Sequence, residues 1–360
     1  MVKVMTSRER VQATFMGQIP DRCPIHYFAN SGIDARLKSH FNLAANDFEG
    51  LQRALKVDFR SIYPPYIGPK LHADIPERGV KSNIWGVRTK WIEHGSGGYW
   101  DFVDYPLQNA TEEEVATWPM PSPDQYNYDM IPAFCKKYDE FALGLGDPGC
   151  ADIMNSNGMI RTPEQSYIDL ALDEPAGLLL AKRRSDIQLE WMQRTLEKAG
   201  GRVDFLWIGE DMGTQNGPLI SMDTYRKHLK PIHQKFIDLA RTWNIPIMIH
   251  TCGSCSWVYD ELIEMGINVV DTLQPEAANM APAYLKKTFG GRVAFQGCIS
   301  TAGPVAYGTA QETDTYCRDT LEIMKPGGGY SFAPTHSLQD NSPTENVLAM
   351  YQAAIRYGSY

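Results

Sequence analysis

The sequence lacks several features that mark whole classes of protein. Its first residues, MVKVMTSRERVQATFMG, contain no apolar stretch of signal-peptide length, and no segment approaches the roughly 18 uninterrupted apolar residues of a membrane span. It has no extended run of lysine or arginine, and its formal net charge is -9, so a surface that tracks nucleic-acid phosphates is not expected. We expect a cytoplasmic protein, independent of membranes, whose partners are small molecules or other proteins.

The sequence also lacks a disulfide framework. Its seven cysteines are odd in number and irregularly spaced, unlike the paired cysteines of a small secreted domain. We therefore expect reduced thiols, some of them available as metal ligands. Internal repeats and low-complexity segments are absent as well.

What is present fits one large folded unit. Hydrophobic residues make up 43% and charged residues 21% of the chain, which is ordinary for a globular protein with a buried core. The length of 360 residues allows two average domains or one α/β barrel, since such barrels often exceed about 250 residues.

Apolar runs that end in polar or small residues recur along the chain, and helical patterns such as residues 222–244 and 256–266 separate most of them. The candidate strands are Pro24–Phe28, Asp58–Tyr63, Phe141–Gly146, Asp204–Glu210, Pro246–Thr251, Asn268–Leu273, Val293–Cys298 and Gly328–Ala333. Eight strands alternating with helices predict an α/β fold of the (β/α)8 TIM-barrel type, as a single domain over residues 1–360. A doubly wound open sheet is the alternative, but no G-x-G-x-x-G turn follows the first strand.

The alternation breaks between the second and third strands. Residues 82–106, SNIWGVRTKWIEHGSGGYWDFVDYP, predict one or two β-hairpins with a Gly-rich turn, inserted near the barrel mouth. The following residues 111–128 are acidic and then proline-rich, which predicts a short helix leading into an extended linker.

The segment Ile245–Cys255, IPIMIHTCGSC, carries the strongest sign of chemistry. An apolar run typical of a buried strand stops at His250, and Cys252 follows two positions later on the same side of an extended chain. Residues at this end of a barrel strand point into the active-site mouth. An imidazole and a thiolate suit zinc, although ligand type alone leaves copper(I) and iron open.

Other polar residues occupy equivalent strand ends. Glu210 and Asp211 are candidate catalytic acids, because carboxylates beside an apolar strand are costly unless paired or bound to an ion; helix N-terminal acids are the alternative. Cys255 is expected to pack in the next helix. The remaining candidates around the mouth are Gln274, Glu276, Cys298 and His336, with the aromatic residues Tyr27, Tyr63, Trp85 and Trp100 as walls for a planar substrate.

At these residues the sequence resembles the uroporphyrinogen decarboxylase superfamily, and within it the zinc-dependent, corrinoid-linked methyltransferases. The resemblance runs from SRERVQATFMGQIPDRCPIHYF to SPTENVLAMYQAAIRYG and is densest from Gly209 onward. It implies zinc ligands at His250 and Cys252. The third ligand in that branch is commonly a cysteine shortly before TP-x-EN. This chain departs from the pattern with His336 before SPTEN, and His336 is the expected third metal ligand.

The resemblance implies methyl transfer between a small methylated, for example methoxylated aromatic, donor and the cobalt of a corrinoid. No D-x-H-x-x-G corrinoid signature occurs, so a separate corrinoid protein is the expected partner. The residues expected to bind the substrate are His26, Tyr27, Tyr63, Gln274, Glu276 and Cys298. Three alternative functions stay open: a methylcorrinoid:thiol methyltransferase, a decarboxylase, and a binding module with structural zinc. The sequence also leaves a homo-oligomer open. The decarboxylases use an arginine-rich N-terminal segment, whereas CPIHYFANSGIDARLK has His26 and Tyr27 there.

Overall fold

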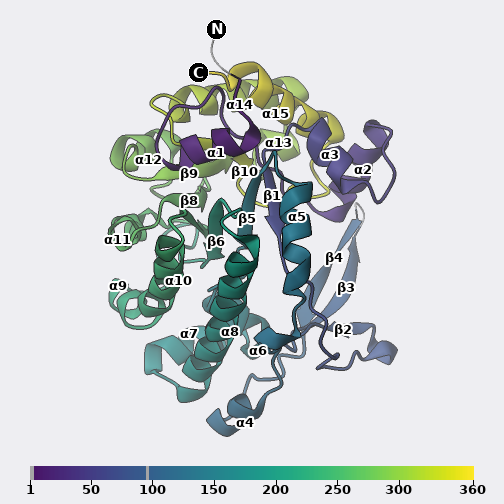
Figure 1. Ribbon diagram of the computed structural model, residues 1–360, viewed down its shortest axis with the longest axis vertical. Helices are drawn as coiled ribbons and strands as arrows, with labels where there is room; N and C mark the ends of the chain where they lie inside the picture. The colour runs from purple at the N-terminus through teal and green to yellow at the C-terminus, as the bar shows by residue number, and fades with distance from the viewer. Residues whose placement is uncertain (1–3, 95–96) are drawn as a thin grey trace.

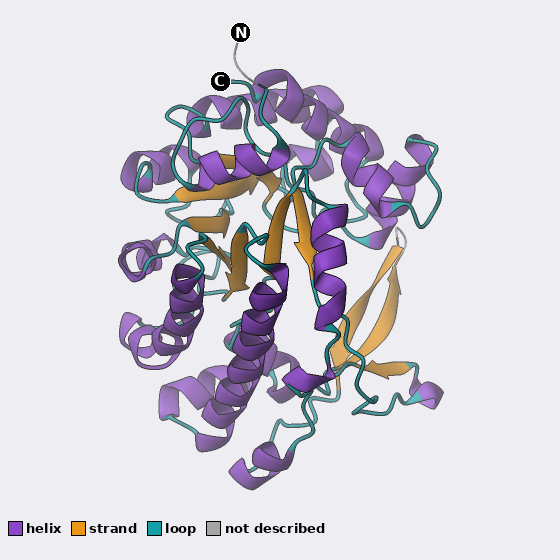
Figure 2. Ribbon diagram, viewed as in Figure 1, coloured by secondary structure: helices purple, strands orange, loops and turns teal. Residues whose placement is uncertain are grey.

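The main sheet of the protein is parallel, curled and central. The computed structural model describes residues 4–94 and 97–360. Its seven-stranded sheet has the order β1-β5-β6-β7-β8-β9-β10, and helices surround it on the outside (Figure 1, Figure 2). The strands are β1 (Phe59–Ile62), β5 (Ala142–Gly146), β6 (Phe205–Gly209), β7 (Ile247–Thr251), β8 (Val269–Thr272), β9 (Ala294–Ile299) and β10 (Tyr330–Pro334).

Most strands of this sheet are buried along their whole length because both faces are covered. β5 and β6 are buried at every residue, and β7 at all but His250. Such continuous burial is typical of parallel strands between a packed interior and a layer of helices. Seven of the eight predicted strands are therefore confirmed to within a few residues at their ends.

The predicted strand Pro24–Phe28 is extended but is not a regular strand. Ile25 forms a parallel bridge with Phe332 of β10, and Ala29 forms another with Leu338. On the other side the Asp58 N–H donates to the Ile25 carbonyl at 2.9 Å, while the Asp58 carboxylate accepts from the Ile25 N–H at 2.8 Å. The segment thus bonds to both edges of the curled sheet, an arrangement consistent with a TIM-like barrel.

The helices follow the strands as the sequence pattern predicts. The helix α8 starts at Pro175 and ends before Gly200, whose φ of 58° suits the left-handed position after a helix. The predicted helix 222–244 is observed as α9, a π-helical turn and α10 in succession. The α-helices are α1 (Ser7–Phe15), α2 (Ser31–His40), α3 (Phe48–Ala54), α4 (Glu112–Thr117), α5 (Ile131–Lys137), α6 (Met154–Arg161), α7 (Pro163–Leu172), α8 (Pro175–Ala199), α9 (Met222–Thr224), α10 (Lys230–Thr242), α11 (Tyr259–Met265), α12 (Pro282–Phe289), α13 (Pro304–Tyr307), α14 (Ala310–Met324) and α15 (Thr344–Tyr357).

Shorter helical turns join these elements. They are the 3-10 turns η1 (Pro76–Arg78), η2 (Pro123–Gln125), η3 (Tyr128–Met130) and η5 (Ser256–Val258), and the π-helical η4 (Tyr225–Leu229). The predicted stretch 111–128 accordingly contains the short α4 and then irregular chain. Among the described residues, no helix combines the length and the apolar character that crossing a membrane requires.

The predicted hairpin insertion is a separate antiparallel sheet. It has three strands, β2 (Val80–Ser82), β3 (Arg88–His94) and β4 (Gly97–Val103), and it stands apart from the main sheet in Figure 1. Gly97 comes so close to Asp340, in the loop after β10, that a Cβ there would lie 2.2 Å from the carboxylate. The hairpin therefore reaches the loops at the C-terminal ends of the strands. The Gly-rich turn falls partly on residues 95 and 96, outside the described residues.

The opposite end of the sheet is held by ion pairs. Arg8 of α1 pairs with Asp204 at 2.7 Å, and Arg10 pairs with Asp58 at 2.6 Å. Both aspartates precede a strand, so α1 lies at the N-terminal ends of β1 and β6. Polar groups at that end of a barrel serve stability, which leaves the other end for chemistry.

Candidate metal centre

The end of β7 positions His250 and Cys252 at the C-terminal end of the sheet. His250 is the one residue of the strand that is not fully buried, and Cys252 follows it on the same side of the chain. The chain then turns at Gly253, with φ of 77°. A Cβ there would lie 2.3 Å from the Gly213 carbonyl oxygen, so only glycine fits beside Cys252.

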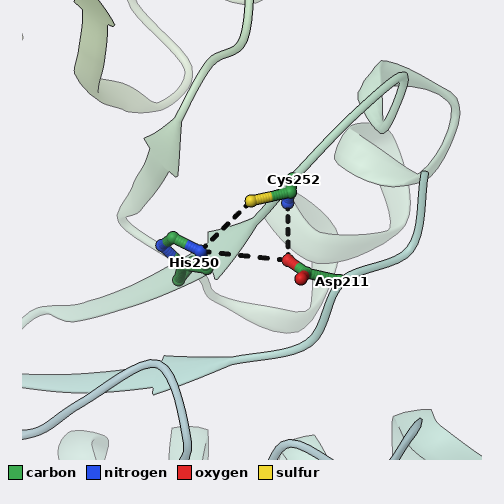
Figure 3. A group of neighbouring side chains, drawn as sticks. All are labelled: Asp211, His250 and Cys252. Atoms are coloured by element: carbon green, nitrogen blue, oxygen red, sulfur yellow. Dashed lines mark hydrogen bonds and ion pairs between the residues drawn. The ribbon is translucent and has the colours of Figure 1, made fainter. Parts of the chain in front are cut away.

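Three side chains converge at this point: Asp211, His250 and Cys252, called the metal group below (Figure 3). His250 Nε2 lies 3.4 Å from Cys252 Sγ and 3.9 Å from Asp211 Oδ1. One ligand atom from each residue lies within 4.8 Å of the other two. The Cys252 backbone N–H also donates to Asp211 Oδ1 at 2.8 Å, which fixes the carboxylate beside the thiol.

The neighbouring strand orients the imidazole. His250 Nδ1 donates to Asp271 Oδ2 at 2.9 Å, and Gln296 Nε2 donates to the other Asp271 oxygen at 3.1 Å. His250, Asp271 and Gln296 are register partners on β7, β8 and β9, so parallel pairing itself aligns them. A histidine ligand typically donates its second ring nitrogen to a carboxylate in this way, which leaves Nε2 free to bind a metal.

The electrostatics of the group follow from these contacts. Burial alone would lower the pKa of His250, but its hydrogen bonds to Asp271 and Cys252 outweigh burial and raise that pKa well above its ordinary value. Burial raises the pKa of the Cys252 thiol, while the imidazole opposes that rise.

Backbone strain gathers next to the metal group. Thr272 and Leu273 at the end of β8 have φ of 90° and 50°, and Cys298 in β9 has φ of 68°. Left-handed backbone is rare for residues other than glycine, above all for a β-branched one, and costs about 1–3 kcal/mol. Thr272 Oγ1 nonetheless lies 2.8 Å from His250 Nδ1. The strained turn thus supplies a second contact to the imidazole.

Glu210 points away from its neighbour Asp211. Its oxygens accept the N–H groups of Ile153 and Met154, at 2.8 and 3.0 Å, at the start of α6. Burial raises the pKa of Glu210 to about 8, although these two hydrogen bonds act to lower it. Asp152 is also buried, and its pKa is raised well above normal by burial and by the charge of Glu210.

His233 completes this second group, with Nε2 3.8 Å from Glu210 Oε2. Burial lowers the pKa of His233 to about 4, so the ring is neutral at neutral pH. Asp152, Glu210 and His233 are called the buried acid cluster below. The prediction that Glu210 or Asp211 reaches the centre thus applies to Asp211, whose second oxygen accepts from Asn155 Nδ2 at 2.9 Å.

The other predicted residues at the strand ends are not among the three side chains that converge. Gln274 accepts the Gly253 N–H at 3.1 Å, and Glu276 accepts from the Ser300 hydroxyl. Cys298 is buried, and burial raises the pKa of its thiol. His336 is exposed in the loop after β10 and is not among the three side chains that converge.

Cys255 packs in the interior, as expected. Its Sγ lies 3.2 Å from the Tyr259 hydroxyl and 3.5 Å from the Thr251 carbonyl oxygen, just before the helical turn at residue 256. Its role as a packing cysteine is confirmed by these contacts.

A cavity of about 880 Å³ lies beside the segment 24–28 and β1, and His26, Tyr27 and Tyr63 are among its lining residues. The ring of His26 sits edge-on to Phe59 and Trp207, at 5.1 and 5.5 Å. Burial lowers the pKa of His26 to about 4. The volume falls in the range of small-molecule sites, which is about 300–1,000 Å³.

The aromatic walls predicted at the mouth are only partly assembled. Tyr27 donates to Asp34, and Tyr63 donates to the Gly146 carbonyl at 2.6 Å. Trp100 lies on the hairpin sheet against Trp91 and remains 42% exposed, away from the metal group.

Sequence reasoning missed the supporting residues Asp271, Gln296 and Asn155. Asp271 carried a usable signal, because an acid inside the apolar run VVDT must find a partner. Its partner could not be read from the sequence, since the alignment with His250 depends on strand register.

Comparisons with known proteins agree with this architecture. The profile of the family described as uroporphyrinogen decarboxylase (URO-D) matches residues 192–357. A solved structure titled methyltransferase from Methanosarcina mazei superposes with a TM-score of 0.62 at 16% identity, covering 98% of this chain and 99% of that one. A D-psicose 3-epimerase solved with D-fructose covers 65% of this chain and 84% of its own, with 12% identity and a TM-score of 0.34, too low to support an argument. No curated protein matches the chain.

Proposed function

The match over residues 192–357 relates the chain to the uroporphyrinogen decarboxylase superfamily, and from this premise we propose that the protein is a zinc-dependent methyltransferase. It would move a methyl group between a small methylated donor and the cobalt of a corrinoid carried by a separate protein. The observation that carries the proposal is the convergence of Asp211, His250 and Cys252 with His250 Nδ1 already held by Asp271.

The donor set and its spacing support zinc. Nitrogen and oxygen ligands bind zinc at about 2.0–2.2 Å and sulfur at about 2.3 Å, so two ligand atoms at a tetrahedral angle lie roughly 3.4–3.6 Å apart. The observed separations from His250 Nε2 are 3.4 Å to Cys252 Sγ and 3.9 Å to Asp211 Oδ1. Little movement would bring all three atoms onto one ion.

The half-exposed position of the group favours catalysis over a structural role. The side chains of His250 and Asp211 are 14% and 29% exposed. A structural zinc site is usually closed by four protein ligands, whereas a catalytic site leaves a position for substrate or water. His336 stays a predicted further ligand, which the loop after β10 would have to bring inward.

Bound zinc would supply Lewis acidity to the atom that carries the methyl group, or would hold a thiolate when a thiol is the acceptor. The chain's own residues do the rest. Asp271 fixes the tautomer and the direction of His250. Asp211 keeps Cys252 in place through the backbone N–H, and Asn155 in turn fixes Asp211.

The similarity in fold to the Methanosarcina mazei methyltransferase favours methyl transfer over decarboxylation, and the cavity at His26 agrees. Decarboxylases of this superfamily bind polycarboxylates through arginines of the N-terminal segment. Arg60, which lines this cavity, is instead neutralised by Glu49 at 2.8 Å. A methoxylated aromatic compound remains our proposed donor. The corrinoid protein would dock at the open end of the sheet, beside the hairpin sheet.

Metal analysis of the purified protein is the first test. We expect about one zinc per chain, lost in His250→Ala and in Cys252→Ala and retained in Cys255→Ala, the matched control three residues away. The wild-type and zinc-stripped proteins are then assayed with methylated donors and corrinoid proteins, following cobalt by absorbance. Zinc that survives both ligand substitutions would contradict the site, and transfer of equal rate without zinc would contradict the function.

A further inference from the structure

A second, smaller cavity contains a buried arginine. Its volume is about 320 Å³, and its walls come from the ends of β1 and β5, from α6 and α8, from the connection between β2 and β3, and from the chain after η2. We call it the arginine pocket. The lining residues that matter here are Tyr63, Trp85, Tyr126, Ser156, Arg184 and Trp191.

Arg184 is 7% exposed, and its charge has no close partner. Its Nη1 donates to the Ser156 carbonyl at 3.0 Å, but its buried Nε has no hydrogen-bond partner. Among residues 4–94 and 97–360, no carboxylate lies within 4.0 Å of its guanidinium. Burial lowers the pKa of Arg184 to about 10, with Asp152 opposing from a distance, so the side chain stays charged at neutral pH.

The other buried arginines of the described chain show how unusual this is. Arg10, Arg60 and Arg161 are each 5% exposed or less, and each has a carboxylate at 2.6–2.8 Å. A buried cation without a partner is strongly unfavourable unless an anion is supplied from elsewhere. Arg184 therefore points to an anionic ligand.

The walls of the pocket favour a flat ligand. The Arg184 guanidinium carbon lies 5.0 Å from the centre of the Trp85 ring. Tyr126 and Trp191 are stacked at 6.4 Å with an angle of 26°, and Tyr63 contacts Trp191 at 6.2 Å. The one acid in the lining, Asp147, is engaged by the Gly149 N–H at 2.7 Å and the Tyr63 hydroxyl at 3.3 Å.

We propose that the arginine pocket binds a small aromatic carboxylate, whose carboxylate group pairs with Arg184 and whose ring packs against Trp85, Tyr126 and Trp191. The pocket adjoins the metal group through α6, because Asn155 holds Asp211 while the next residue, Ser156, accepts from Arg184. The ligand is therefore a substrate of the class of methylated aromatic acids. That last assignment rests on the proposed methyltransferase function, whereas binding itself does not.

The test compares benzoate with benzamide, which has nearly the same shape and no charge. Binding is followed by calorimetry and by quenching of tryptophan fluorescence. We expect saturable benzoate binding, with benzamide at least about tenfold weaker, since a charge-assisted contact is lost. Equal binding of the two compounds, or no saturable benzoate binding, overturns the proposal.

Two substitutions on α8 locate the site. Arg184→Met should weaken benzoate binding about tenfold or more, whereas Arg194→Met removes the same charge from a half-exposed position and should leave it unchanged. Removing an unpaired buried charge is not expected to unfold the protein, which a thermal melt checks. Should Arg184→Met fold poorly, the benzoate to benzamide ratio of the wild type decides.

Zinc-stripped protein separates this proposal from the proposed function. Benzoate should bind it as well as it binds the zinc form, because Arg184 and not the metal holds the carboxylate. Loss of binding on stripping, or in His250→Ala, would place the carboxylate on the metal and overturn the pocket. If methyl transfer occurs equally fast from neutral methoxylated aromatics, the substrate assignment fails while the methyltransferase function stands.

Discussion

Two consecutive acids at the end of β6 lie in opposite environments. Asp211 faces the strand ends with His250 and Cys252, where its carboxylate is half-exposed. Glu210 is 1% exposed in the buried acid cluster and accepts two N–H groups from the start of α6. Side chains of an extended chain alternate in direction, so one residue of displacement separates a candidate metal ligand from a residue that holds α6.

The difference teaches that a perturbed pKa does not by itself locate chemistry. Burial raises the pKa of Glu210 to about 8, a value that would suit a general acid. Both of its oxygens are nevertheless occupied by backbone donors that hold α6 against the sheet. Asp211, next along the chain, is the one that reaches ligand atoms of other residues.

A matched pair of amide substitutions tests the difference between Asp211 and Glu210 most directly. Asp211→Asn should weaken zinc binding by about a hundredfold, because a charged ligand is replaced by a neutral amide in a three-residue group. Glu210→Gln should leave zinc binding within about threefold and instead cost about 1–3 kcal/mol of folding free energy, since one backbone N–H loses its acceptor. Zinc affinity comes from competition with a chromophoric chelator. The reverse pattern would exchange the two roles.

The support of His250 by Asp271 gives the next largest effect. Asp271→Asn should weaken zinc binding about tenfold, as substitutions of residues behind a metal ligand commonly do. The asparagine oxygen can still accept from Nδ1, and Gln296, whose Oε1 has no partner, can turn to match the new amide. Folding stability should therefore change little. An unchanged zinc affinity would show that Thr272 alone orients the ring.

The buried acid cluster makes a prediction about pH. Burial lowers the pKa of His233 to about 4, below the ordinary value of 6.5, so the unfolded chain takes up a proton in this range before the folded chain does. The contribution of His233 to the free energy of unfolding should therefore fall as pH drops from 6.5 towards 4, by at most about 1.4 kcal/mol per pH unit, whereas the raised pKa of Glu210 acts in the opposite sense. In urea titrations the stability of the wild type minus that of His233→Leu should fall over this range, while the same difference for His40→Leu, at an exposed helix end, should not. Parallel curves of stability against pH for wild type and His233→Leu would contradict this role of His233.

The fold was predictable because most of its strands are short, largely apolar runs, a composition that indicates burial on both faces. The segment Pro24–Phe28 departs from a regular strand for local reasons. Proline has no N–H to donate, and the Asp58 carboxylate accepts the Ile25 N–H in place of a backbone carbonyl. The two edges of the curled sheet therefore meet at this segment without a continuous ladder of backbone hydrogen bonds.

The site was predictable where it is local in sequence. His250 and Cys252 lie two residues apart, so the end of β7 alone positions them. Asp271 lies 21 residues from His250 and meets it through strand register, which no local pattern encodes. Arg184 was missed for a similar reason, because helix α8 joins the arginine pocket only through tertiary packing.

Substitution of His336 has the smallest expected effect on zinc binding. It tests the third ligand, for which sequence and structure point to different residues. The sequence pattern places it third beside His250 and Cys252, while Asp211 occupies the third position in the observed group. Its exposed place after β10 means that zinc binding would have to order the loop, and that ordering offsets part of the energy a fourth ligand contributes. We therefore expect His336→Ala to weaken zinc binding by about threefold or less, against about a hundredfold for Asp211→Asn. A loss as large as that of Asp211→Asn would assign the third ligand to His336, because only a residue bound directly to zinc could match it.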